Sequence, residues 1–251
     1  MTTTTKPIGA GLWARLLTLL FVKAIGRPWL RRICKASPGL VTVFGLCIKV
    51  KPYPHLGEAY AMRFVAQHTS IPVPKVYCAF VYSGWSYVVM SRIPGEMACL
   101  GWQRRSAESK ERVLSQLRRM VTELRSVRLP EDISGVAGVD GGCFSDCRLP
   151  TKTIWDSFPT TRSFHQALAN GIKFDVEYKS LASDMSELFE FYRGYGEQVV
   201  LTHGDLSSLN ILVRQDDVNT FWADEVDHFL TPMPHEFEMD TIRRKYFGDF
   251  R

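Results

Sequence analysis

The sequence lacks a hydrophobic run long enough to cross a lipid bilayer as a helix. Its stretch Leu16–Val22 is apolar apart from Thr18, but Arg15 and Lys23 bracket it, and a spanning helix needs about 20 apolar residues. The small residues that follow imitate a signal peptide only weakly. We therefore expect residues 1–39 to form an N-terminal helical extension that packs on the body of the protein. Contact between this helix and a membrane is the alternative.

Long basic runs and clustered cysteines are also missing. Basic residues occur in short, scattered clusters without interleaved aromatic residues, which disfavours nucleic-acid binding. Of the six cysteines only Cys143 and Cys147 are close together, and no histidine lies near them at zinc-site spacing. Reduced thiols in a cytoplasmic protein are the expectation. With 45% hydrophobic and 23% charged residues, the composition is that of a folded globular chain rather than a disordered one.

The first part of the chain has the patterns of β structure. Branched and apolar residues predict strands over Leu40–Lys51, with a turn at Gly45. Glu58–His68 has a helical pattern that ends before two prolines. Val76–Val81 and Trp85–Met90 predict two strands of a hairpin, joined by a tight Ser-Gly turn.

Beyond this hairpin the apolar spacing becomes helical. Ser106 is expected to cap a long helix whose apolar residues recur every three or four positions up to Leu124. Leu181–Tyr192 predicts another helix. The change of period predicts an α+β fold with a small β-rich N-lobe over residues 40–91 and a helical C-lobe over residues 92–251.

The stretch from His203 to Asn210, followed by the apolar strand Ile211–Val213, is the most informative part of the sequence. An aspartate, an asparagine five residues later and then a strand is the spacing of a kinase catalytic loop, here residues 203–213. The Asp205 carboxylate can orient a substrate hydroxyl and accept its proton. The amide oxygen of Asn210 can ligate Mg²⁺ without repelling phosphates, and His203 would brace the loop through hydrogen bonds. A polar turn before a strand is the structural alternative.

A kinase also needs a lysine on a strand to neutralise the nucleotide phosphates, and a helical carboxylate to hold it. Lys49 lies on a predicted strand, and Glu58 begins the next predicted helix. Lys51 competes with Lys49, because alternation with a period of two places both on the same strand face. A surface lysine on an edge strand is the plain alternative for Lys49.

Several segments, in family order, resemble the fungal-type branch of the aminoglycoside phosphotransferase and choline kinase-like family. They are Phe44–Lys49, Gly57–Val65, Thr69–Val76, Tyr87–Met90, Ile93–Glu96, Val139–Gly142 and Thr202–Val213. The resemblance runs from about residue 40 to the end of the chain. It implies a two-lobed protein-kinase-like fold with ATP between the lobes and the roles given above for Lys49, Glu58, Asp205 and Asn210. It also implies that Met90 to Ile93 border the adenine.

The sequence departs from that family at two places. No clear glycine-rich phosphate loop precedes Lys49. The family's catalytic loop is followed by a strand ending in a metal-binding aspartate, usually in an Ile-Asp-Trp-Glu setting, which this chain lacks. The residues after Thr220 resemble the family's extreme C-terminus instead, which indicates an internal deletion and an incomplete C-lobe. An exon-boundary error in a gene model would leave the same gap.

A second interpretation keeps the metal site. Asp224 lies fourteen residues after Asn210, close to the family's interval, and residues 221–223 could form the strand before it. Asp227 and Glu225 are weaker substitutes.

Two functions follow from these patterns. The first is an ATP- and Mg²⁺-dependent phosphotransferase acting on a hydroxyl of a small molecule. The second is a catalytically impaired kinase-fold remnant, a pseudokinase or truncated product, that binds a ligand or partner without turnover. A lost Mg²⁺ ligand favours the second, because it removes several kcal/mol of transition-state stabilisation. The sequence does not specify the substrate.

Overall fold

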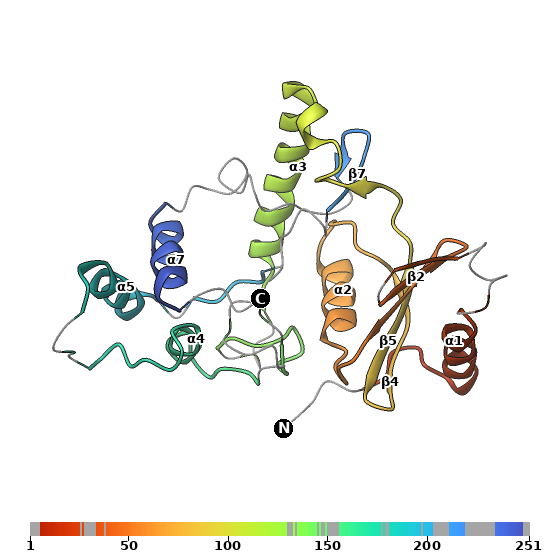
Figure 1. The fold of residues 1–251 in the computed structure, drawn as a ribbon, viewed down its shortest axis with the longest axis horizontal. Coiled ribbons are helices and arrows are strands. Elements are labelled where there is room, and N and C mark those ends of the chain that lie inside the picture. The colour runs from red at the N-terminus through yellow and green to blue at the C-terminus, as the bar shows by residue number, and fades with distance from the viewer. Residues whose placement is uncertain are drawn as a thin grey trace.

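The computed structural model describes residues 6–25, 27, 34–37, 39–129, 133, 135–144, 146, 149, 156–176, 178, 181–196, 198–202, 211–218 and 234–247. Of residues 35–37, 217 and 234–237 it describes the backbone alone. Figure 1 shows a sheet with its helices at one end of the molecule and further helices at the other. The α+β class expected from the sequence is confirmed.

The sheet has five antiparallel strands in the order β1-β2-β3-β5-β4. They are β1 (Lys35–Ser37), β2 (Leu40–Val43), β3 (Leu46–Lys51), β4 (Val76–Tyr82) and β5 (Trp85–Ser91). Both predicted hairpins are confirmed, β2–β3 and β4–β5. Strand β1 lies within the extension that we expected to be helical. It pairs with the outer side of β2 through Lys35↔Thr42, so β2 is an inner strand and the short β1 forms the edge of the sheet.

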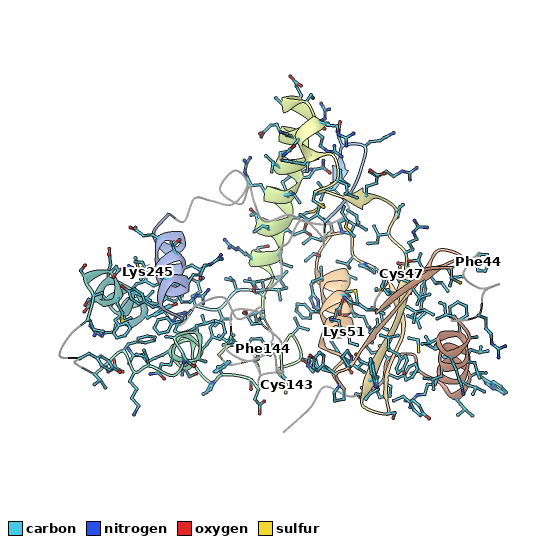
Figure 2. All side chains as sticks on the ribbon, viewed as in Figure 1. Phe44, Cys47, Lys51, Cys143, Phe144 and Lys245 are labelled. Atoms are coloured by element: carbon cyan, nitrogen blue, oxygen red, sulfur yellow. The ribbon has the colours of Figure 1, made fainter. Side chains whose placement is uncertain are left out.

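A two-residue turn closes the β2–β3 hairpin. Val43 pairs with Leu46, and between them Phe44 and Gly45 have φ values of 43° and 79°. Two successive residues with positive φ are typical of the turn whose twist matches that of the flanking strands. Glycine adopts this conformation at no steric cost. The exposed Phe44 ring stands at the tip of the hairpin (Figure 2).

Helices cover both faces of the sheet (Figure 1). Helix α1 (Leu12–Ala24) packs Phe21 and Val22 against Val41, Val43 and Ile48. The other face is covered by α2 (Gly57–His68), where Leu56 and Ala59 contact Val88 and Met90 in one buried cluster. Val88 and Met90 alternate with Val89, which packs on the α1 side, as side chains of a strand buried on both faces must. Packing of the N-terminal helix on the body is therefore confirmed.

The chain leaves the sheet through β6 (Glu96–Met97) and the short 3₁₀ helix η2 (Trp102–Arg104) and enters α3 (Ala107–Ser126). The Ser106 hydroxyl accepts a hydrogen bond from the Ser109 amide, so the predicted cap is confirmed. The buried residues of α3 form a core with Trp102, Ile211 and Val213. This core joins α3 to a small sheet of β6, β7 (Leu212–Arg214) and β8 (Asp217–Val218).

In the described part of the chain, three further helices follow: α4 (Thr161–Leu168), α5 (Ser183–Gly194) and α7 (Pro234–Phe247). Helix α5 lies two residues later than the sequence pattern indicated. Phe189 and Tyr192 of α5 pack with Met239 and Ile242 of α7. Lys245 of α7 also forms an ion pair with Asp184 at the start of α5, with 2.6 Å between nitrogen and oxygen. Among the helices of the described part of the chain, none is both long and apolar enough to cross a membrane.

Candidate active site

Four of the eight predicted site residues lie in the described part of the chain: Lys49, Glu58, Met90 and Ile93. The other four lie outside the described residues, namely His203, Asp205, Asn210 and Asp224. The described part of the site consists of the sheet, α2 and strand β7 at the end of the predicted catalytic loop, since residues 198–202 before the loop do not form the strand that the sequence indicated.

An ion pair joins the sheet to α2. The Lys49 ammonium nitrogen lies 2.6 Å from Oε1 of Glu58, as predicted from the sequence. Lys51 lies 2.7 Å from Oε2 of the same carboxylate. Both lysines occupy the α2 face of β3, and Figure 2 shows Lys51 beside α2. Glu58 thus holds two cations instead of one, which sequence reasoning treated as alternatives.

The charge of Glu58 is stabilised by its partners. Burial by itself would raise the pKa of Glu58, but the two neighbouring ammonium groups outweigh it and hold the pKa below its ordinary value. Its place in the first turn of α2 adds the favourable field of the helix N-terminus. The carboxylate is therefore charged at neutral pH. The ammonium groups of Lys49 and Lys51 both pair with this carboxylate, so the three side chains together carry one net positive charge. These side chains are 33–45% exposed.

Tertiary contacts fix the start of α2. Leu56 and Ala59, on either side of Gly57 and Glu58, are fully buried against the sheet. The His55 ring accepts a hydrogen bond from the Gly57 amide at Nδ1, so its Nε2 carries the hydrogen and donates to the Cys143 carbonyl at 2.9 Å. This histidine therefore ties the loop before α2 to a segment nearly ninety residues away.

Met90 and Ile93 lie where the chain leaves the sheet. In the β3–β5 ladder Cys47 pairs with Met90 and Lys49 pairs with Val88. Directly opposed residues share a face, so Met90 lies on the same face as Lys49, two pairs further along the ladder. Its side chain is buried in the cluster beneath α2. Ile93 follows in the connector and is half-buried.

The connector is bonded to the end of the predicted catalytic loop. Strand β6 pairs with β7 through Met97↔Leu212, and the Ala98 amide donates to the Ile211 carbonyl at 2.8 Å. Gly95, with φ 144°, allows this approach. A Cβ atom there would lie 3.1 Å from the Cβ of Leu212. Residue 211, near the end of the predicted loop, is thus held beside the segment that leaves β5.

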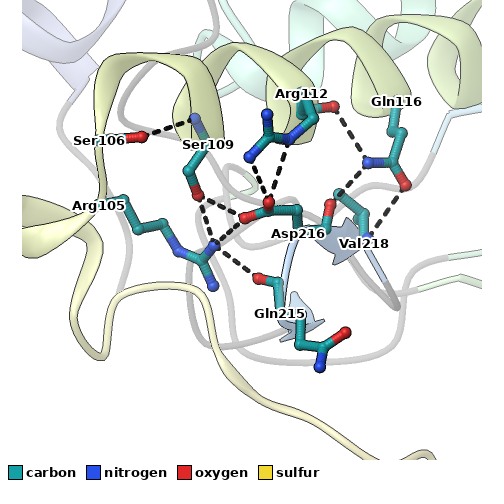
Figure 3. A network of polar contacts seen from close by, with 8 residues as sticks. All are labelled: Arg105, Ser106, Ser109, Arg112, Gln116, Gln215, Asp216 and Val218. Atoms are coloured by element: carbon teal, nitrogen blue, oxygen red, sulfur yellow. Dashed lines mark hydrogen bonds and ion pairs between the residues drawn. The ribbon is translucent and has the colours of Figure 1, made fainter.

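A polar network fastens the β7–β8 turn to α3 (Figure 3). The Asp216 carboxylate accepts hydrogen bonds from the Ser109 hydroxyl at 2.6 Å and from the guanidinium groups of Arg105 and Arg112. Gln116 donates to the Asp216 carbonyl at 2.7 Å and accepts from the Val218 amide. The hydrogen bond from Ser109, followed by those from Arg112, lowers the pKa of Asp216.

Sequence reasoning missed this network. Asp216 and its partners are about a hundred residues apart in the chain, and no local pattern connects them. The β7–β8 turn contains a residue in the left-handed region, Gln215, with a φ of 59°. The network positions the hairpin whose first strand, β7, begins within the last residues of the predicted catalytic loop.

An open pocket of about 410 Å³ lies between β6 and η2. Its lining residues are Glu96, Leu100, Gly101, Arg104 and Arg105. Neither Lys49 nor Glu58 lines it, so this pocket is separate from the ion-pair cluster. Among the described residues, no group of three or more histidine, cysteine or acidic side chains is placed to hold a metal ion. The predicted ligands Asn210 and Asp224 lie outside those residues.

A scan against models of known protein families found no match to this chain, and a search of curated proteins found no significant relative. The likeness to aminoglycoside phosphotransferases and choline kinases therefore rests on the motifs quoted above.

Proposed function

We propose that this protein is an ATP-dependent phosphotransferase with a two-lobed kinase-like fold that transfers phosphate to a hydroxyl of a small molecule. The observation that carries the proposal is the ion pair between Lys49 on β3 and Glu58 in the first turn of α2. Kinases use such a pair to fix a strand lysine against the nucleotide phosphates. The pair lies at the two positions where the motif order required it.

A second observation supports the same function. The β6–β7 pairing and the hydrogen bond from Ala98 to Ile211 hold Ile211 and Leu212, which lie in the predicted 203–213 loop, beside the connector that follows β5. A kinase needs this proximity, because its catalytic loop and its hinge border the same nucleotide.

In the proposed reaction the fixed Lys49 ammonium neutralises the α- and β-phosphates of ATP. Asp205 orients the substrate hydroxyl and accepts its proton as the oxygen attacks the γ-phosphorus, whose bond to the β,γ-bridging oxygen breaks so that ADP leaves. Asn210 and Asp224 are the oxygen donors that would hold Mg²⁺, a donor set that suits this ion. When bound, Mg²⁺ supplies charge neutralisation to the phosphates. His203 braces the loop.

The alternative is a kinase-fold remnant that binds a ligand or partner without turnover. It is favoured by the sequence after Thr220, which lacks the family's Ile-Asp-Trp-Glu strand and resembles its extreme C-terminus. A chain that lost that strand would keep Lys49 and Glu58 and lose the metal-binding carboxylate. Such a protein would bind ATP weakly and with little dependence on Mg²⁺.

Calorimetric titration with ATP, with and without Mg²⁺, separates these functions when combined with an ATP-consumption assay on hydroxyl-bearing small molecules. Lys49→Met should weaken ATP binding at least tenfold. Lys51→Met is the matched control, because Lys51 shares the strand face and the Glu58 carboxylate but lies two pairs further from Met90. Asp205→Ala should leave ATP binding intact and lower turnover by orders of magnitude.

The outcomes are distinct. Mg²⁺-dependent binding with turnover, both sensitive to Asp224→Ala, supports the enzyme with an intact metal site. Binding without turnover on any substrate supports the remnant. No ATP binding, or equal loss in the Lys49 and Lys51 variants, refutes the nucleotide site built on Lys49.

A further inference from the structure

Helix α1 exposes an apolar stripe that the rest of the described chain does not cover. Its members are Leu12, Trp13, Leu16, Leu17 and Leu20, each 44–79% exposed. They recur at the spacing of one helix face. The opposite face packs Phe21 and Val22 on the sheet, so the stripe points away from the body. We call these five residues the α1 stripe.

The exposed apolar residues of the α1 stripe are grouped on one helix rather than scattered over the surface. One helix of 13 residues supplies five of the large apolar side chains that are exposed in the described part of the chain. Single exposed apolar residues are ordinary on soluble proteins, whereas a contiguous group of them indicates a surface that contacts something else.

The charge around the α1 stripe has one sign. The first 57 residues contain nine lysines and arginines and no aspartate or glutamate. Of the chain's 31 basic residues this leaves 22 for the remainder, which holds all 26 acidic residues and is therefore net negative. Lys6 before α1, Lys23 in its last turn and Arg27 just beyond it are exposed. Among the described residues next to α1 in the chain, the exposed charges are thus all cations.

We propose that α1 docks the protein on an anionic lipid surface, with the stripe among the acyl chains and Lys23 and Arg27 among the headgroups. A helix of 13 residues is about 20 Å long, too short to cross a bilayer but suited to lie in its interface. Leucine and tryptophan on one face with lysine and arginine beside them is the composition of such helices.

Charge complementarity favours lipid over a second copy of the chain. A symmetric dimer through this face would bring its basic residues, Lys6, Lys23 and Arg27, close to the same set on the second copy, and like charges across an interface are unfavourable. A surface rich in phosphatidylserine presents the opposite charge, and each basic residue near it adds about 1 kcal/mol, or about fivefold in binding. This proposal is independent of the nucleotide site.

The test uses the full chain with sedimented vesicles of phosphatidylcholine, with and without phosphatidylserine. Binding should require phosphatidylserine and weaken at 1 M salt, where the Debye length falls to about 3 Å. The double variant Leu16→Glu/Leu17→Glu should lower binding at least tenfold. The double variant Leu100→Glu/Val176→Glu is its control, because these side chains are 60% and 44% exposed, against 44% and 63% for Leu16 and Leu17.

A charge pair completes the experiment. Lys23→Gln/Arg27→Gln should lower binding by about fivefold for each charge removed. Arg128→Gln/Lys173→Gln removes the same charge from exposed positions outside α1 and should have little effect. All substituted side chains are exposed, and denaturant unfolding of each variant checks that it folds.

Several results would overturn the proposal. They are equal binding to neutral and anionic vesicles, binding that survives the Leu16/Leu17 variant, and no vesicle binding at all. In that last case sedimentation velocity identifies the occupant. A concentration-dependent dimer that the Leu16/Leu17 variant abolishes would assign the α1 stripe to an interface between copies of the chain.

Discussion

Glu58 should be coupled energetically to both lysines of β3, and more strongly to Lys49 than to Lys51. The perturbations are Glu58→Gln, Lys49→Met and Lys51→Met, made singly and in pairs so that double-mutant cycles isolate each interaction. Both nitrogen–oxygen distances are short, 2.6 and 2.7 Å, but the side chains are a third or more exposed. Solvent screening therefore limits each pair to about 0.2–1 kcal/mol.

The exposed fractions rank the two pairs. Lys49 is 33% exposed and Lys51 is 45% exposed, so we expect about 1 kcal/mol for the first pair and about half of that for the second. The assay is urea unfolding at neutral pH. With an m-value of about 2.5 kcal/mol per molar, 1 kcal/mol moves the midpoint by about 0.4 M, which is measurable.

The pH dependence of this coupling has a definite sign. Because the pKa of Glu58 is lowered in the folded protein, its contribution is present above the ordinary carboxyl pKa of the unfolded chain. It is lost as the pH falls through the folded value. Coupling to both lysines should vanish in acid and shrink at 1 M salt. Coupling of Glu58 to Lys51 alone would refute the assignment of Lys49, and coupling that persists in acid would show that the contacts are not ionic.

Three further predictions concern the scaffold around the site. Asp216→Asn should lower the amide hydrogen-exchange protection factors of the β7–β8 hairpin, and lowering the pH through the depressed pKa of Asp216 should lower them in the wild type, after correction for the slower intrinsic exchange in acid. Glu108→Gln, in the first turn of α3, should not. Leu117→Ala removes a fully buried side chain from the core of α3 and should lower the free energy of unfolding by about 2–5 kcal/mol in urea, whereas Leu117→Met should lower it by less than about 1.5 kcal/mol. Ser106→Ala removes the α3 cap and should lower it by about 1 kcal/mol in the same assay.

The sequence predicted those parts of the fold whose signals are local. Turn residues and alternating apolar side chains located both hairpins, because a two-residue loop leaves antiparallel strands one possible partner. The cap at Ser106 and the three- and four-residue spacing located α3. The ion pair of Lys49 with Glu58 followed from order along the chain. That Lys51 shares the carboxylate did not, since alternation gives a common face but not the reach of two flexible side chains to two oxygens.

Contacts between distant segments could not be predicted in this way. Asp216 looks like one of two acidic residues in a polar turn, and only the packing of α3 brings Arg105, Ser109 and Arg112 to it. Strand β1 is three residues long, which is too short for a periodic pattern in the sequence. It is recognised as a strand only by its pairing with β2 in the structure. The roles of His203, Asp205, Asn210 and Asp224 remain predictions from the sequence.

The pairing of β6 with β7 has a consequence for the order in which the chain folds. The pairing of Met97 with Leu212 closes a loop of more than a hundred residues. The entropic cost of closing a loop of that length is about 4 kcal/mol beyond a constant term. The hairpins of the five-stranded sheet close loops of two residues. During synthesis the sheet strands up to Ser91 can therefore pair early, while the nascent chain still lacks the loop that is predicted to carry the chemistry. Any nucleotide site built from both parts is completed late, after residue 212 has emerged and docked.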